Sequence, residues 1–206
     1  FAPVTTLVQT KNALWMGTSN GAIRKDAKWH YYGGKRWLHD NKINDILPVT
    51  ENLVWIATSK GISEIAQVNY SFEKKSEYFE KRLNQRHLHH NLVSDCRFET
   101  PGDTTSWSCH TNDNDGLWTS IYLAAESFRY ATTGEKEAYD NAVRTFLAME
   151  KLQTVNPIPG FVARSYVTID ESTGRDGEWH VSPDGKWKWK GDTSSDEIVG
   201  HMFAYP

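Results

Sequence analysis

The hydrophobic and polar positions of this chain follow one period in its first third and another in its second half. Up to about residue 67, short apolar runs alternate with turns, which is typical of β-strands. Asn20-Gly21 ends one such run and Lys60-Gly61 ends another, and both dipeptides suit hairpin turns that need a positive φ. From about residue 112 the apolar positions recur at helical spacing. The pattern therefore predicts a β-rich first part and a helical last part.

Three helices are predicted in the last part. The first starts near residue 112, carries its apolar residues on one stripe and stops near Gly134. The second runs from about Lys136 to Gln153 and ends before two prolines. The third opens at Ser194, whose spacing to Glu197 is that of a capping box.

Other segments complete the outline. Residues 71 to about 90 place apolar side chains at helical spacing among Lys and Glu, which predicts an amphipathic linking helix with a solvated charged face. Residues 160–167 have the pattern of a strand, and residues 182–185 that of a turn between two tryptophan-bearing segments. We therefore expect the chain to divide into three parts: residues 1–70, 71–95 and 96–206.

One phrase of the first part occurs twice. Leu14–Ala22 returns as Val54–Ile62, and the step from Trp15 to Trp55 is 40 residues. A period of this size marks the four-stranded blades of a β-propeller. The Trp-apolar-Gly-Thr-x-x-Gly phrase resembles the two-component-regulator type of propeller repeat. The alternative is two unrelated hairpins whose Trp side chains pack in a core.

The resemblance implies about two blades, and a propeller ring usually needs about four to eight. We therefore expect a fragment of a larger protein, whose remaining blades and helices lie elsewhere in the full-length chain. Unpaired strand edges invite aggregation, so the isolated chain is expected to be poorly soluble.

The N-terminal segments of the first and third helices can be aligned, with Asp115–Tyr122 matching Asp196–Phe203. Helix pairs with polar openings and long loops resemble part of an α/α toroid, in which inner helices direct one set of ends to a common cleft. The expected fold class is thus mixed and multidomain: a partial β-propeller followed by α-helical hairpins of an incomplete toroid. Glycoside hydrolases, epimerases and polysaccharide lyases share the toroid, so fold alone does not select a reaction.

Composition narrows the partners. The net charge of −3 and the lack of a basic stripe exclude nucleic acid as an expected ligand, and no apolar run is long enough for a membrane span. Nine Trp and nine Tyr are many for 206 residues. This aromatic excess fits either a core or surfaces that stack on sugar rings. The resemblance to the propeller and toroid families implies an oligosaccharide or polysaccharide ligand and a periplasmic or extracellular location.

Acids near the helix openings are the first candidates for chemistry. Hydrolysis of a sugar linkage usually needs two carboxylates, one of them protonated in a water-poor setting. The alternative is helix capping, which would lower the pKa of such an acid. Elimination at a uronic acid instead needs a His or Tyr base and a group that holds the developing charge. The candidate catalytic residues are His110, Asp113, Asp115, Tyr166, Asp196, Glu197 and His201.

Further polar and aromatic residues in the same segments are candidates for holding a saccharide. They are Asn112, Asn114, Trp118, Arg164, Trp187, Trp189 and Asp192. A Trp inside a helix is more often a core residue, and a His four residues after a Glu is often an ordinary helix-surface pair. These alternatives stay open at this point.

Metal signals are weak. Residues 111–116 resemble the start of a calcium loop but lack its first acid, and Tyr122 stands where the bidentate Glu belongs. His87, His89 and His90 cluster without a Cys or acid at metal spacing. No metal ligand or definite cofactor is predicted, and a single divalent cation on the helix-opening carboxylates is left open. The two cysteines, Cys96 and Cys109, fit either a disulfide or two thiols.

The preferred hypothesis is a fragment of a carbohydrate-active enzyme. It would cleave an acidic or decorated polysaccharide, by elimination or hydrolysis, at a cleft formed by inner-helix N-termini. The alternative is a non-catalytic ligand-binding sensor module of a signalling protein.

Overall fold

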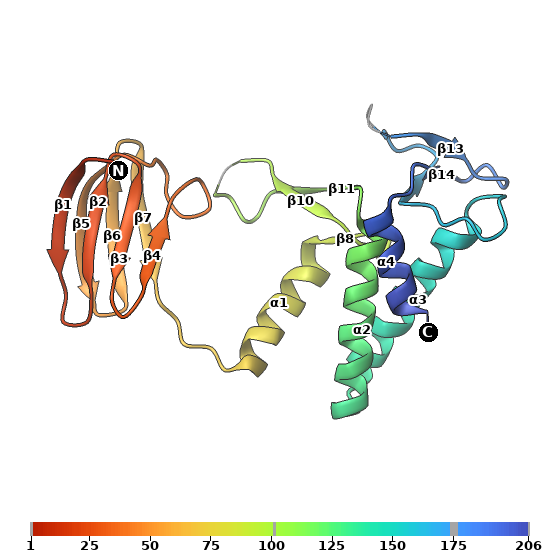
Figure 1. Cartoon of the computed structure of the whole chain (residues 1–206), viewed down its shortest axis with the longest axis horizontal. Coiled ribbons are helices and arrows are strands. Elements are labelled where there is room, and N and C mark those ends of the chain that lie inside the picture. Colours follow the sequence, from red (N-terminus) through yellow and green to blue (C-terminus); the bar gives the residue numbers. More distant parts are fainter. Residues whose placement is uncertain (1, 101, 174–176, 206) are drawn as a thin grey trace. The chain divides into compact units, whose positions relative to one another are not determined.

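The structure, a computed structural model, describes residues 2–100, 102–173 and 177–205. The chain forms two compact units (Figure 1). The first contains Phe1–Lys75 and Phe98–Ser106, and the second contains Ser76–Arg97 and Trp107–Pro206. The expected division at residues 70 and 95 remains a prediction.

The first unit holds two antiparallel sheets. The first sheet has the order β1-β2-β3-β4 and the second the order β5-β6-β7, so each is a simple meander. The strands are β1 Val4–Gln9, β2 Leu14–Thr18, β3 Gly21–Lys25, β4 Trp29–Tyr32, β5 Ile43–Thr50, β6 Leu53–Thr58 and β7 Gly61–Ala66.

The two copies of the repeated phrase adopt the same local structure. Thr18 Oγ1 donates to the Gly21 carbonyl at 2.7 Å, and Thr58 Oγ1 donates to the Gly61 carbonyl at 2.7 Å. Both glycines have positive φ, 110° and 142°, which other residues rarely adopt. The two predicted hairpin turns are therefore confirmed, each with its Thr hydroxyl closing the turn.

The core of this unit lies between the two sheets. It includes Trp15, Ile43 and Ile56, all at most 1% exposed. Gly17 lets the sheets approach closely, because a Cβ there would lie 2.6 Å from Ile43 Cγ2. Trp15 and Gly17 are two residues apart on β2 and share a face, so the Trp15 face of the first sheet meets the second sheet.

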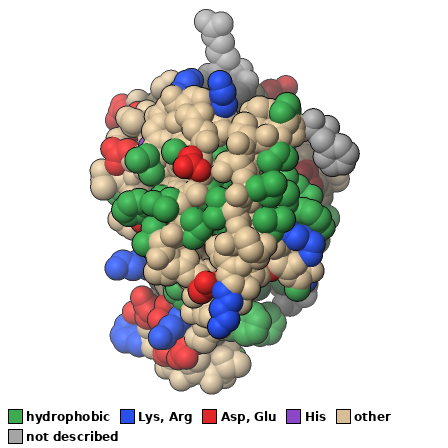
Figure 2. All heavy atoms as spheres, turned by 90° about the vertical axis from the view of Figure 1, so that its left-hand side faces the viewer, with side chains coloured by type: hydrophobic (Ala, Val, Ile, Leu, Met, Phe, Trp, Pro, Cys, Tyr) green, Lys and Arg blue, Asp and Glu red, His purple; other side chains and the backbone are tan. Residues whose placement is uncertain are grey.

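The second sheet presents its corresponding face to solvent. Trp15 is 1% exposed but Trp55, its counterpart in the repeat, is 44% exposed. Leu47 stands opposite Trp55 in the β5–β6 register, and it is exposed as well. Hydrophobic side chains also gather across the middle of the side of the molecule shown in Figure 2.

The second unit contains most of the helical chain. The helices are α1 Phe72–Arg86, which begins within the first unit, α2 Asp115–Thr133, α3 Lys136–Thr154 and α4 Ser195–Ala204. All four agree with the predicted helices, and α2 ends in left-handed Gly134, as expected. Helix α2 packs against both α3 and α4, and the core around them includes Leu123, Met149 and Leu152.

Short strands complete the chain. They are β8 Leu88–His89, β9 Leu92–Val93, β10 Asp95–Phe98, β11 Trp107–His110, β12 Tyr166–Thr168, β13 Trp179–Val181 and β14 Trp187–Lys190. The last three form a sheet of order β12-β14-β13.

The predicted strand over residues 160–167 is wrong for most of its length, because β12 begins only at Tyr166. The preceding segment bonds to the end of α3 instead. The Ala163 N–H donates to the Leu152 carbonyl at 2.8 Å, and the Asn156 amide donates to the Phe161 carbonyl. The predicted turn at residues 182–185 is confirmed, with left-handed Gly185.

Two further expectations are tested here. Cys96 and Cys109 are free thiols, and Cys109 donates to the Arg86 carbonyl at 2.9 Å. Among the helices of the described residues, none combines the length and apolarity that a membrane span requires.

Candidate functional site

The openings of α2 and α4 meet where each helix carries a glycine. A Cβ on Gly116 would overlap Glu197 Oε1 and lie 2.6 Å from His201 Nε2. A Cβ on Gly200 would lie 2.6 Å from Leu117 Cα. The glycines therefore allow the two helices to approach closely enough for side chains of α4 to reach the N-terminus of α2.

Glu197 uses this approach to cap the neighbouring helix. Its side chain is fully buried, and Oε2 accepts the Leu117 N–H at 3.0 Å. The predicted capping box is therefore only half formed: Ser194 Oγ accepts from the Glu197 N–H, but the Glu197 carboxylate is bound elsewhere. A carboxylate at a helix N-terminus meets unpaired N–H groups and the positive end of the dipole, whichever helix supplies it.

His201 continues the chain of contacts. Its Nε2 lies 3.3 Å from Glu197 Oε1, and its Nδ1 lies 3.1 Å from the Tyr205 hydroxyl. That hydroxyl donates to the Met149 carbonyl at 3.2 Å, so Nδ1 must be the donor to its oxygen. His201 and Glu197 are therefore a buried, hydrogen-bonded pair rather than an ordinary surface pair on the helix.

Asp115 is a second buried carboxyl group at the start of α2. Its Oδ1 accepts from Ser94 Oγ at 2.9 Å and from the Asn112 N–H at 3.1 Å, and its Oδ2 accepts from Ser165 Oγ at 2.5 Å. Burial raises the pKa of Asp115 to about 7 and outweighs the opposing hydrogen bonds from Ser165 and Ser94. The expectation of a capping acid with a lowered pKa is therefore wrong for Asp115.

The two neighbouring aspartates differ from Asp115 in burial and in the direction of their pKa shifts. Asp113 and Asp196 are exposed. The hydrogen bond from Lys190 lowers the pKa of Asp113, and the hydrogen bond from Ser194 lowers that of Asp196. In the overlay of the two helix openings, the buried acid that corresponds to Asp115 is thus Glu197 and not Asp196.

Arg164 is committed to the loops that precede these helices. Its guanidinium donates to the Asp113 carbonyl, to the Asp192 carbonyl at 2.8 Å and to Ser194 Oγ at 3.2 Å. The largely buried Lys190 bonds to the Asp113 carboxylate. Arg164 and Lys190 therefore hold the loops that precede α2 and α4 in place, and Arg164 is not free to bind a substrate.

The remaining predicted residues are spread over several environments. Tyr166 and Trp189 are buried in the hydrophobic core, whereas His110 and Trp118 are exposed. The Asn112 amide oxygen accepts the Asn114 N–H at 2.7 Å, which is a local loop bond. The structure thus assembles Asp115, Glu197 and His201 and separates the exposed candidates from them.

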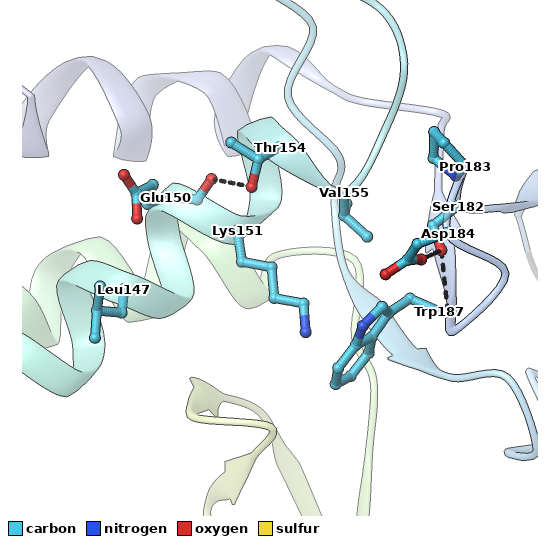
Figure 3. A pocket seen from close by; sticks show the side chains of 9 residues that line it. All are labelled: Leu147, Glu150, Lys151, Thr154, Val155, Ser182, Pro183, Asp184 and Trp187. Carbon is cyan, nitrogen blue, oxygen red and sulfur yellow. Dashed lines mark hydrogen bonds between the residues drawn. The ribbon is translucent and has the colours of Figure 1, made fainter.

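A pocket of about 450 Å³ lies in the second unit, between the end of α3 and the β13–β14 turn. Figure 3 shows its lining: Leu147, Glu150, Lys151, Thr154, Val155, Ser182, Pro183, Asp184 and Trp187. Of the predicted substrate-binding residues, only Trp187 lies here.

Lys151 is the central charge of this pocket. Its Nζ lies 2.7 Å from the centroid of a Trp187 ring and 4.7 Å from that of Tyr166. Burial lowers the pKa of Lys151 to about 8. The sequence did not single out Lys151, because a Lys in the last turn of a helix is an ordinary partner for the helix dipole.

One group within the described residues has the side chains and spacing to hold a metal ion. It consists of His89, His90 and Glu171, whose ligand atoms lie within 4.8 Å of one another. No acid lies at metal spacing from this histidine cluster in the sequence, because Glu171 is some 80 residues further along the chain.

No family model, curated protein or solved structure matches the chain.

Proposed function

We propose that the chain is part of a carbohydrate-active protein that binds an acidic polysaccharide and cleaves it by elimination. The observation that carries this proposal is the pocket between α3 and β14, in which Lys151 lies against Trp187. The ammonium group of Lys151 matches the carboxylate of a uronic acid, and an aromatic side chain such as Trp187 offers an apolar surface to a sugar ring.

The other lining residues suit the hydroxyl groups of a saccharide. Glu150, Thr154, Ser182 and Asp184 supply hydrogen-bonding oxygens around the same pocket. Sugar ligands need many such partners, because each buried hydroxyl that is left unpaired costs free energy. Two of these residues are acids, so the pocket carries both signs of charge.

Lys151 also supplies a base. With a pKa of about 8, roughly a tenth of it is neutral at pH 7, and a lysine with such a pKa is suited to proton abstraction. Binding uses the protonated form of Lys151, and the elimination uses its neutral fraction: neutral Nζ takes the proton beside the sugar carboxylate, and the bond to the leaving glycosidic oxygen breaks. A carbon–carbon double bond forms in the ring, and the Nζ ammonium formed in this step gives its proton to the leaving oxygen.

This assignment moves the reaction away from the helix openings. Asp115, Glu197 and His201 are at most 1% exposed, and each is hydrogen-bonded inside the protein. Hydrolysis with two carboxylates remains the second form of the reaction, since Glu150 and Asp184 both line the pocket.

We also propose that the two sheets of the first unit are consecutive blades of a propeller. The 40-residue period and the repeated turn geometry support this. The Trp15 face of the first sheet is covered by the second, so the Trp55 face would be covered by a further blade of the same kind. The helices would belong to an α/α toroid in the larger protein, which would meet its polymeric substrate in the periplasm or outside the cell.

The test is to incubate the 206-residue chain with a panel of uronic-acid polysaccharides and a neutral polysaccharide. The ultraviolet absorbance of unsaturated ends measures elimination, reducing ends measure hydrolysis, and calorimetry measures binding. We expect binding and elimination with at least one acidic polymer. Lys151→Ala should abolish the elimination, and Lys151→Arg should keep binding while the rate falls.

Lys136→Ala is the matched control, because Lys136 lies on the same helix but is exposed and paired with Asp140. It should behave as the unsubstituted chain. Absence of binding to every acidic polymer would overturn the proposal, and so would activity that survives Lys151→Ala.

The second candidate is a ligand-binding sensor module without catalysis. The burial of Asp115, Glu197 and His201 favours it, because satisfied buried groups act as structural links between helices. This candidate would be selected if an acidic oligosaccharide binds at Lys151 and neither unsaturated ends nor reducing ends are formed.

A further inference from the structure

His89, His90 and Glu171 form a cluster that the proposed saccharide chemistry does not use. His89 Nε2 lies 2.7 Å from Glu171 Oε2, and His90 Nε2 bonds to the other carboxylate oxygen, Oε1. The side chains are 19%, 23% and 33% exposed, in this order. One side of the cluster is therefore open to an entering ion.

The backbone turns both rings to the same side. Successive side chains of a strand point to opposite faces, so His89 and His90 would normally diverge. Here His90 and Asn91 have φ values of 51° and 68°, in the left-handed region that is unusual for residues other than glycine. As a result, the two imidazole rings have centroids only 4.4 Å apart.

Glu171 is held in place by its own turn. Its Oε1 accepts from the Thr168 N–H at 2.9 Å and from Thr168 Oγ1 at 2.7 Å. Its carbonyl accepts from Lys188 Nζ at 2.7 Å. The carboxylate is thus fixed on the end of β12 and faces the histidines of the β8–β9 hairpin.

His90 is also supported from behind. The Tyr166 hydroxyl donates to the His90 carbonyl at 3.0 Å, and the His90 ring packs edge-on against Trp187. His89 Nδ1 is buried and makes no hydrogen bond to the described residues. The Nε2 atoms of both rings face Glu171, so these are the atoms that can reach an ion.

We infer that His89, His90 and Glu171 bind a divalent transition-metal ion of the zinc type. Two imidazole nitrogens and one carboxylate, with an open fourth position, form the ligand set of many catalytic zinc sites. Hard cations such as Mg²⁺ and Ca²⁺ prefer oxygen ligands, so the two imidazoles select against them.

The spacing is close to what a bound ion needs. Bonds of about 2.0–2.1 Å in tetrahedral geometry place ligand atoms roughly 3.3 Å apart. The 2.7 Å contact between His89 and Glu171 must therefore open by less than about 1 Å, and separations of up to 4.8 Å within the cluster must close by up to about 1.5 Å. The ion replaces two hydrogen bonds and leaves one ligand position for water.

The experiment is calorimetric titration of chelator-treated 206-residue chain with Zn²⁺, with Mg²⁺ and Ca²⁺ titrated separately. We expect one Zn²⁺ per chain with a dissociation constant below about 1 μM, and no comparable binding of the hard cations. His90→Ala and Glu171→Gln should each weaken Zn²⁺ binding more than about 100-fold, beyond the loss typical of an outer-shell change.

His87→Ala is the matched control, because His87 lies two residues before His89 but outside the cluster. It should leave the affinity unchanged. Circular dichroism shows whether each variant folds, and the imidazole NMR signals of the unsubstituted chain give a readout that needs no variant. Zn²⁺ should shift the signals of His89 and His90 and leave those of His201 in place.

Three results would overturn the inference. They are no stoichiometric Zn²⁺ binding, binding that survives both His90→Ala and Glu171→Gln, and NMR shifts confined to other histidines.

Discussion

Glu197 Oε2 accepts the backbone N–H of Leu117 at 3.0 Å, so that a carboxylate of α4 caps the N-terminus of α2. This bond joins two helices that lie about 80 residues apart in the sequence. It also places a buried carboxyl group at the positive end of a helix dipole and beside His201.

Replacing Glu197 by alanine should therefore destabilise the second unit strongly. The change removes the cap, leaves a cavity and leaves His201 without its partner, for an expected loss of about 3–5 kcal/mol. Urea denaturation followed by circular dichroism measures the loss. Glu197→Gln keeps an acceptor for Leu117 and should cost less.

Asp196→Ala is the matched control for this position, since Asp196 is an exposed acid on the preceding residue. Its denaturation curve should overlay that of the unsubstituted chain. Equal curves for Glu197→Ala and Asp196→Ala would contradict the role of Glu197.

Gly116 should tolerate no side chain. A Cβ there would overlap Glu197 Oε1, and both groups are buried. Although alanine is the better helix former, Gly116→Ala should push α4 away from α2 and lower the free energy of unfolding by about 2 kcal/mol or more. Helix propensity alone predicts a higher melting temperature for Gly116→Ala than for the unsubstituted chain. Such an increase would refute the close approach of the two helices.

Asp115 should make stability depend on pH. Its folded-state pKa of about 7 lies above the unfolded value of about 3.9, so the folded chain holds this proton more tightly. The resulting stability is fully present below about pH 4 and is lost as pH rises to about 7, for a total of up to about 4 kcal/mol.

Asp115→Asn removes this proton and keeps the shape of the side chain. The unfolding free energies of the unsubstituted chain and of Asp115→Asn are measured in urea from about pH 4 to about pH 8. Their difference isolates the contribution of Asp115 ionisation from that of all other groups. We expect the unsubstituted chain to lose stability relative to the variant as pH rises. Parallel curves would show that Asp115 titrates normally.

Local patterns predicted the elements of this chain because local contacts form them. The helical stripes, Gly134 and the two Asn-Gly and Lys-Gly turns depend on residues close in sequence, and the structure confirms them. The segment before β12 was mispredicted because bonds to the end of α3 replaced those of a strand.

The sites were harder to predict because they depend on distant partners. The capping-box pattern at Ser194 correctly gave the start of α4, but the close approach at Gly116 offered Glu197 a better partner. Glu171 joins His89 only through the folded chain. The pKa of Asp115 follows from burial, which no local motif of the α2 opening specifies.

Trp15 and Trp55 provide the last prediction, because the repeat gives them the same sequence context and the fold gives them opposite environments. Trp15 is 1% exposed between the two sheets, whereas Trp55 is 44% exposed and its indole N–H donates to Glu64 at 3.0 Å. Trp15→Ala should therefore cost about 3–5 kcal/mol of unfolding free energy, and Trp55→Ala should cost little.

The exposed Trp55 face should instead govern association. Leu47 and Ile62 are 57% and 66% exposed on the same sheet, and exposed apolar patches of this kind promote contact between chains. We expect the 206-residue chain to associate with rising concentration in analytical ultracentrifugation, and Leu47→Ser or Ile62→Lys to reduce this without unfolding the chain. A strictly monomeric chain at high concentration would show that the Trp55 face needs no covering blade.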